Sequence, residues 1–136
     1  MWEACKGGAR LFIQRFWQPT TACMTCMPGS WGNVWSLTHW TIALQTGIIT
    51  GLLAVLLSLT PARALYHSHM GNALVVGFLA VVADVFSHPS HFGGEFGEPL
   101  LTGAVAFLLA LVVGSLFEDR ARRMRVAWST LTRQRD

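Results

Sequence analysis

The stretch LYHSHMGNALVVGFLAVVADVFSHPSH, from Leu65 to His91, decides the fold of this 136-residue chain. It contains an apolar run long enough to cross a bilayer as a helix, with one carboxylate, Asp84, well inside it. His88 follows Asp84 by one helical turn and shares its face. An ionisable residue in a membrane segment costs about 2.5–3.5 kcal/mol at the bilayer centre. We therefore expect Asp84 to be paired inside a helical bundle, and it is a candidate functional residue.

The composition of the whole chain is typical of a membrane protein. Hydrophobic residues make up 52% of it and charged residues 12%, which is roughly half the charged fraction of soluble domains. Apolar segments at residues 40–59, 65–87 and 100–117 are each long enough to span a bilayer. The length fits one domain, residues 1–136. The sequence therefore predicts an all-α integral membrane three-helix bundle with amphipathic interfacial helices at both ends.

Amphipathic segments flank the three predicted spans. Residues 2–17 place apolar side chains on one side of a helix, which we expect either to lie in the interface or to pack on other helices. Pro19 is expected to end this helix, and residues 18–39, rich in turn residues and tryptophan, to form an interfacial loop. Residues 118–135 predict a basic amphipathic tail that bends along an anionic leaflet. The arginines expected at the lipid surface are Arg120, Arg122, Arg123 and Arg125.

Small residues recur one helical turn apart within the predicted spans. The first span contains a G-x-x-x-G motif at Gly47 and Gly51, which allows another helix to approach closely. We expect ordinary packing within the chain there rather than a dedicated dimer face. The predicted helix-packing residues are Gly47, Gly51, Ala73, Gly77, Ala106, Ala110 and Gly114.

Basic residues predict the orientation of the chain. The C-terminal tail carries six arginines, which places it in the cytoplasm of a bacterial cell, with the turn at Arg63 on the same side. The acidic loop with Glu95 and Glu98 is then outside the bacterial inner (cytoplasmic) membrane. Three spans place the N-terminal region outside as well, although three basic residues lie between positions 6 and 15.

Potential metal ligands gather near one face of the predicted bundle. Nitrogen and sulfur ligands could bind copper or zinc, and His39 with His88 could instead be the axial ligands of a haem. A single C-x-x-C is a weak motif, and its two cysteines could equally form a disulfide. We therefore expect no cofactor, with haem or copper as the alternatives. The candidate ligands are His39, His88, His91, Cys23 and Cys26.

Asp84 and His88 form the centre of a predicted intramembrane polar site. Gln45, Thr46 and Thr50 of the first span are the candidate partners from another helix, and Gln45 is assigned to the site. Such a cluster can be a structural contact between helices or part of a proton relay. A structural contact is the expectation, because no second acidic residue lies deep in any predicted span.

Common enzyme motifs are absent, including phosphate loops, nucleophile elbows and dinucleotide fingerprints. The sequence therefore predicts a non-catalytic accessory or structural subunit of a larger bacterial inner-membrane complex, which packs against other subunits through its small-residue helix faces. Its expected partners are lipids, other integral membrane subunits or copies of itself, and not nucleic acid. One alternative is a homo-oligomeric, holin-like pore former or small transporter that uses Asp84. The second is a haem or metal-binding membrane anchor of an oxidoreductase.

Overall fold

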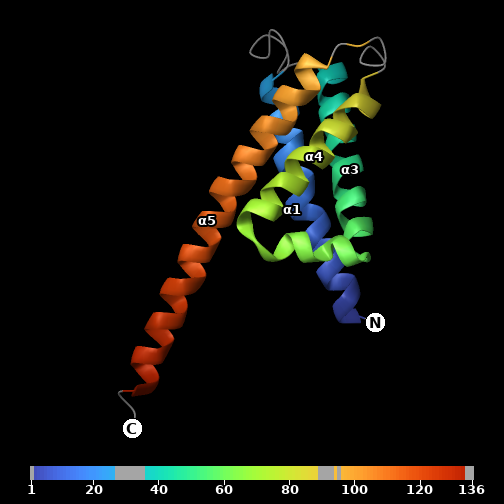
Figure 1. Cartoon of the computed structure of the whole chain (residues 1–136). Helices are drawn as coiled ribbons and strands as arrows, with labels where there is room; N and C mark the ends of the chain where they lie inside the picture. The colour runs from blue at the N-terminus through green and yellow to red at the C-terminus, as the bar shows by residue number, and fades with distance from the viewer. Residues whose placement is uncertain (1, 27–35, 89–93, 95, 134–136) are drawn as a thin grey trace.

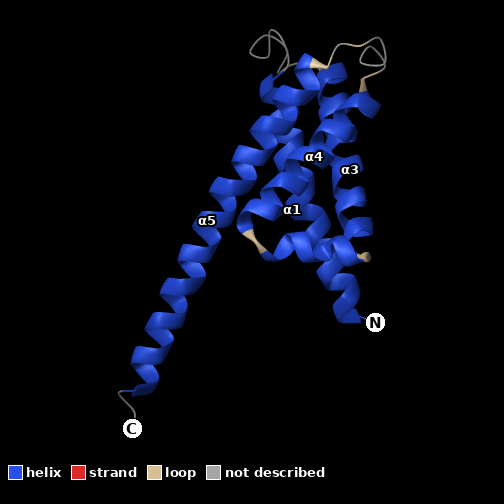
Figure 2. Cartoon of the chain, in the orientation of Figure 1, coloured by secondary structure: helices blue, strands red, loops and turns tan. Residues whose placement is uncertain are grey.

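The computed structural model describes residues 2–26, 36–88, 94 and 96–133, with side chains described for 6–26, 36–88, 94 and 96–116. All regular structure within these ranges is helical, which confirms the predicted all-α class (Figures 1 and 2). The elements are the α-helices α1 (Trp2–Cys26), α3 (Leu37–Ser58), α4 (His69–Ser87) and α5 (Gly97–Arg133), and the short 3-10 helix η1 (Pro61–His67).

Within the described residues, three segments are long and apolar enough to cross a membrane: Leu37–Ser58, His69–Ser87 and Gly97–Leu116. They match the three predicted spans in number and order, which is consistent with a membrane protein. The third does not end near Phe117, because α5 continues as one helix to Arg133. The predicted tail at 118–135 therefore extends the third span rather than forming a separate helix. The side chains of the four tail arginines lie outside the described ones.

The second span begins later than predicted. Residues 61–67 form η1, and Ser68 then caps α4 because its Oγ accepts a hydrogen bond from the Gly71 backbone N–H at 3.0 Å. A serine N-cap of this kind satisfies one of the unpaired amides at a helix start. The helix that carries Asp84 thus begins at His69 and not at Leu65.

The predicted stop of the first helix at Pro19 is wrong. α1 continues through Pro19 to Cys26, so residues 18–26 are helical, and the predicted loop at 27–35 lies outside the described residues. Pro19 is fully buried, and the hydroxyl of Thr20 donates to the Phe16 carbonyl at 2.7 Å. A proline removes one helical hydrogen bond, but packing against neighbouring helices and threonine side chains can compensate for it. Contacts of α1 with α3, α4 and α5 supply that packing.

α1 and α3 pack through the G-x-x-x-G motif. A Cβ placed on Gly47 would overlap the Thr20 side chain and lie 2.7 Å from the Phe16 carbonyl oxygen. A Cβ on Gly51 would lie 2.8 Å from the ring of Phe12. The motif therefore serves contacts within the chain, and α1 packs on the protein itself, as in the second of the two alternatives for residues 2–17.

α4 and α5 also approach each other closely. A Cβ on Gly77 would lie 2.9 Å from the Gly103 carbonyl oxygen, and Gly103 is a packing residue that sequence reasoning missed. Gly114 faces His69, with 3.1 Å between a built Cβ and the ring Nδ1. The central core joins α1, α4 and α5 through residues that are nearly all small: Ala22, Ala73, Val76, Ala80, Ala106 and Ala110.

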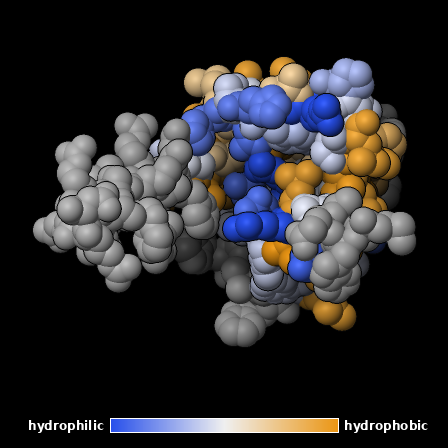
Figure 3. Space-filling model, turned by 90° about the horizontal axis from the view of Figure 1, so that it is seen from below, coloured by the Kyte–Doolittle hydropathy of each residue, from blue (hydrophilic) through white to orange (hydrophobic). Residues whose placement is uncertain are grey.

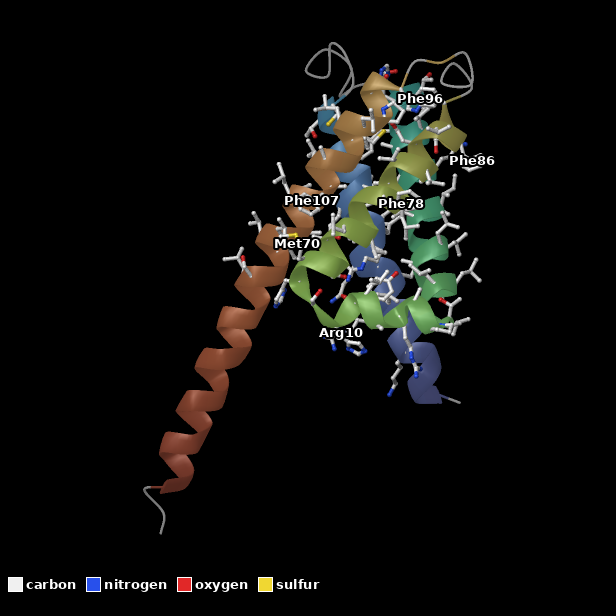
Figure 4. All side chains as sticks on the ribbon, in the orientation of Figure 1. Arg10, Met70, Phe78, Phe86, Phe96 and Phe107 are labelled. Carbon is white, nitrogen blue, oxygen red and sulfur yellow. The ribbon has the colours of Figure 1, made fainter. Side chains whose placement is uncertain are left out.

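Both termini lie at the same end of the bundle. Figure 1 shows α1 and α4 running one way and α3 and α5 the other, so the N-terminus, η1 and the C-terminus share the lower end. Figure 4 places Arg10 at this end and Phe96 at the opposite end. The prediction had put the N-terminal region and the C-terminal tail on opposite sides. The predicted placement of the two ends differs from this arrangement because it counted only the three spans and did not include α1 as a helix running beside them.

Candidate functional site

Asp84 lies fully buried where α1, α3 and α4 meet. Its Oδ1 accepts hydrogen bonds from the Cys23 thiol at 3.4 Å and from the Thr46 hydroxyl at 3.3 Å. The Thr46 hydroxyl and the Cys23 sulfur are themselves 4.0 Å apart. One carboxylate oxygen thus connects three helices that are distant in sequence.

His88 connects this cluster to the end of the bundle. It follows the last residue of α4, and its Nδ1 lies 3.4 Å from Asp84 Oδ1 and 3.3 Å from the Asp84 carbonyl oxygen. The His88 side chain is 12% exposed, whereas that of Asp84 is 0% exposed. The side-chain hydrogen bond to Asp84 raises the pKa of His88, and burial opposes this only in part. A histidine so placed favours its protonated form next to the carboxylate.

Two buried oxygens at this end have no hydrogen-bond partner among the described residues. They are Asp84 Oδ2 and Thr102 Oγ1 of α5. A buried polar atom without a partner destabilises the fold by about 1–3 kcal/mol. Asp84 Oδ2 is therefore the position in the cluster that can accept a hydrogen bond from one further donor.

The structure brings Asp84 and His88 together as predicted but does not bring Gln45 to them. Gln45 is exposed on the outer face of α3, and the adjacent Thr46 faces the carboxylate instead. Adjacent residues point about 100° apart around a helix. The rotation of α3 is set by Gly47 and Gly51, which must face α1, and this turns Gln45 outward.

The predicted metal ligands are only partly gathered. Cys23 is buried against Asp84, Cys26 is half-buried one turn further along α1, and His91 lies outside the described residues. Within the described part of the chain, no group of three or more His, Cys, Asp or Glu side chains could hold a metal ion. The two described cysteines are free rather than bridged. Haem ligation by His39 and His88 stays a prediction, which an absorption spectrum of the purified protein tests.

A second buried polar cluster, which sequence reasoning missed, surrounds Arg15. Its guanidinium donates to Asn72 Oδ1 of α4 and, at 3.3 Å, to Gln18 Oε1, and it lies 5.7 Å from the centre of the Tyr66 ring. Arg15 is only 9% exposed. The sequence feature that could have indicated this cluster is a four-residue spacing. Arg15, Pro19 and Cys23 recur every four residues and therefore lie on one face of α1.

Comparison with known proteins identifies no relative: no family model, curated protein or solved structure matches the chain.

Proposed function

We propose that this chain is a non-catalytic accessory subunit of a larger bacterial inner-membrane complex. The proposal depends on the position of Gln45, whose amide side chain lies on the outer face of α3, a candidate membrane-spanning helix. No described residue of the chain forms a hydrogen bond with it, whereas the hydroxyl of Thr41, which is also exposed, donates to the Leu37 carbonyl at 2.9 Å.

The surroundings of Gln45 are apolar. Further along the same face, Ile48 is 44% exposed, Leu52 54% and Leu56 60%. Gln45 lies eight residues into α3, or about 12 Å along its axis, which is well inside the hydrocarbon region. An amide is unfavourable in lipid unless it is hydrogen-bonded, and polar side chains of this kind join helices across subunit interfaces. A helix of another subunit would supply the missing partner.

The proposed partner contacts the outer face of α3 and not the small-residue faces of the helices. The small-residue faces were expected to serve intermolecular packing as well, but their glycines and alanines are occupied by contacts between α1, α3, α4 and α5. The outer face of α3, defined by Thr41, Gln45, Ile48, Leu52 and Leu56, remains available. We refer to it as the α3 outer face.

We further propose that both ends of the chain are cytoplasmic. Lys6 and Arg10 lie in the first part of α1, at the end of the bundle where the C-terminus also lies (Figures 1 and 4). Arg63 of η1 lies at the same end. This places the basic residues on one side, as the positive-inside rule requires. It replaces the orientation with the N-terminal region outside.

The orientation is tested with single cysteines at the two ends of the bundle. Lys6→Cys and Gly97→Cys are both exposed positions, and a side chain at Gly97 meets nothing within 4 Å. In a Cys5→Ser, Cys26→Ser background, a membrane-impermeant maleimide added to intact spheroplasts should label Gly97→Cys and not Lys6→Cys. Labelling of Lys6→Cys from outside would overturn the orientation.

The partner interface is tested by comparing Gln45→Leu with Thr41→Val. Each chain is purified gently from its native membrane, and co-purifying membrane proteins are quantified by mass spectrometry. The wild type and Thr41→Val should carry partner subunits in a fixed ratio, and Gln45→Leu should lose most of them while retaining its melting temperature. A lone monomer, or equal recovery from all three chains, contradicts the proposal. An assembly of this chain alone would mean self-association.

A second candidate is a proton-linked transporter, because the buried Asp84 has one unpartnered oxygen beside a histidine near the surface. Asp84 faces the core of its own chain, so a path would run through one bundle rather than between identical subunits. High expression should then depolarise cells, and Asp84→Asn should abolish the effect. An unchanged membrane potential would exclude this function.

A further inference from the structure

A cavity of about 580 Å³ opens beside the buried Arg15. It lies between α1, the junction of η1 with α4, and α5, near the end where both termini lie. Figure 3 views the molecule from that end and shows hydrophilic residues gathered around its centre. The volume is within the range of about 300–1,000 Å³ that is usual for small-molecule sites. The residues that line the cavity include Gln14, Arg15, Gln18, Ser68, Asn72 and Val113.

Among the described side chains, the buried guanidinium has no anionic partner. Arg15 Nε makes no hydrogen bond among the described residues, and the partners of the two terminal nitrogens, Gln18 and Asn72, are neutral amides. None of the described residues that line the cavity is an aspartate or a glutamate. A buried cation is stabilised when it is paired with an opposite charge, and leaving it unpaired is strongly unfavourable. Arg15 therefore has both the charge and a donor atom available for an anion.

Other parts of the wall also favour negative charge. The N-terminal end of α4 lines the cavity at Ser68 and Asn72, and a helix N-terminus carries a partial positive charge that attracts anions. Gln14 and Gln18 of α1 contribute amide donors. Lys6, Arg10 and Arg63 belong to segments at the same end, which makes this end electropositive.

The opposite wall of the cavity is apolar. Ala110, Val113 and Gly114 of α5 form it, and Trp17 of α1, 57% exposed, borders it. A ligand can therefore place an anionic group at Arg15 and an apolar part along α5. From this combination we propose that the cavity binds a phosphate group through Arg15 and the start of α4. The phosphate could belong to a phospholipid headgroup or to a soluble phosphate compound.

The proposal is tested by calorimetric titration of the full chain in phosphatidylcholine nanodiscs. One arm adds inorganic phosphate, and the other adds short-chain phosphatidylglycerol, with short-chain phosphatidylcholine as its blank. Saturable heat with phosphatidylglycerol alone assigns a lipid headgroup, and saturable heat with inorganic phosphate as well assigns a general phosphate site. Both results support the proposal. Absence of saturable binding in either arm overturns it.

Three variants separate the cavity from general surface charge. Arg15→Gln should weaken binding at least about tenfold, as expected for loss of a charge-assisted contact. Arg10→Gln removes the same charge from an exposed position of α1 outside the cavity and should change affinity less than about twofold. Val113→Phe fills the cavity from α5, leaves Arg15 intact and should also weaken binding.

The melting temperature of each variant is measured in parallel. Val113→Phe alters a partly exposed residue, so it keeps the test decisive if Arg15→Gln fails to fold. Equal loss of binding in Arg10→Gln and Arg15→Gln would overturn the proposal, because the binding would then follow net charge. Unchanged binding in a folded Val113→Phe chain would overturn it as well, because the ligand would then lie elsewhere.

Discussion

Cys23 of α1 donates its thiol hydrogen to Asp84 of α4 across the core, with Sγ 3.4 Å from Oδ1, although the two residues are 61 positions apart. Thr46 of α3 donates to the same oxygen at 3.3 Å. The relative placement of three helices at this end of the bundle thus depends on one carboxylate oxygen. This connection has measurable consequences for stability, for pH dependence and for thiol reactivity.

Removing the Thr46 hydroxyl should destabilise the protein. Thr46→Val keeps the size and shape of the side chain but deprives Asp84 of one donor, so we expect the free energy of unfolding to fall by about 1–3 kcal/mol. The measurement is unfolding by sodium dodecyl sulfate in mixed micelles. Thr41→Val is the matched control, because its hydroxyl is exposed and bonds only within α3; its effect should be within about 0.5 kcal/mol. Equal losses in the two variants would count against a special role of the Asp84 contact.

Adding a methyl group at Gly47 should also destabilise the bundle. Gly47→Ala pushes a Cβ against the Thr20 side chain and the Phe16 backbone, and such overpacking costs about 1–3 kcal/mol. Gly8→Ala, in α1, is the control because nothing lies within 4 Å of the added atom. The higher helix propensity of alanine should then raise stability by up to about 1 kcal/mol. If Gly47→Ala raised the melting temperature as Gly8→Ala does, the close contact of α1 with α3 would be wrong.

The stability of the protein should fall as the pH rises above neutral. The hydrogen bond to Asp84 raises the pKa of His88 above its ordinary value of 6.5, and Glu98 acts in the same direction. The protonated histidine therefore stabilises the folded state fully below pH 6.5, and this contribution is lost as pH rises through the raised pKa. Melting temperatures of the wild type and His88→Gln, measured from pH 5 to pH 9, should converge at the alkaline end. Parallel curves would exclude this coupling, and the exposed His67→Gln serves as the control.

The two described cysteines should differ sharply in reactivity. Cys23 is 1% exposed and Cys26 is half-buried, so alkylating reagents should modify Cys26 first in a folded Cys5→Ser chain. Cys23 should react only after unfolding. Peptide mass spectrometry after timed treatment with N-ethylmaleimide measures both rates. Equal rates in the folded protein would mean that the Cys23–Asp84 contact does not persist.

Much of the fold follows from local properties of the chain. Three apolar runs of sufficient length, the second of which contains Asp84, predicted the three candidate spans, because the ability to span a membrane is judged from length and composition. Small residues at four-residue spacing likewise predicted close helix contacts, since the surface of a helix repeats approximately every turn. Burial of Asp84 beside His88 also followed from the sequence, because the two lie one turn apart.

The path of α1 did not follow from local properties. Its low hydropathy and Pro19 both favoured an interfacial helix that stops early, but packing against three other helices outweighs one missing backbone hydrogen bond. The predicted orientation followed from the same interpretation, whereas a helix running beside the three candidate spans brings the start of α1 to the end of the bundle where α5 ends. The Arg15 cluster escaped notice for the same reason.

The sequence by itself therefore determined the all-α class, the number and order of the candidate spans, and the pairing of Asp84 with His88, since each depends on residues close together in the chain. Only the tertiary structure decided that Cys23 and Thr46 complete the Asp84 cluster, that Gln45 faces outward, and that Arg15 borders a cavity with Asn72. These outcomes depend on how each helix rotates about its axis. That rotation is set where Gly47, Gly51 and Gly77 permit backbones to touch, between segments far apart in the sequence.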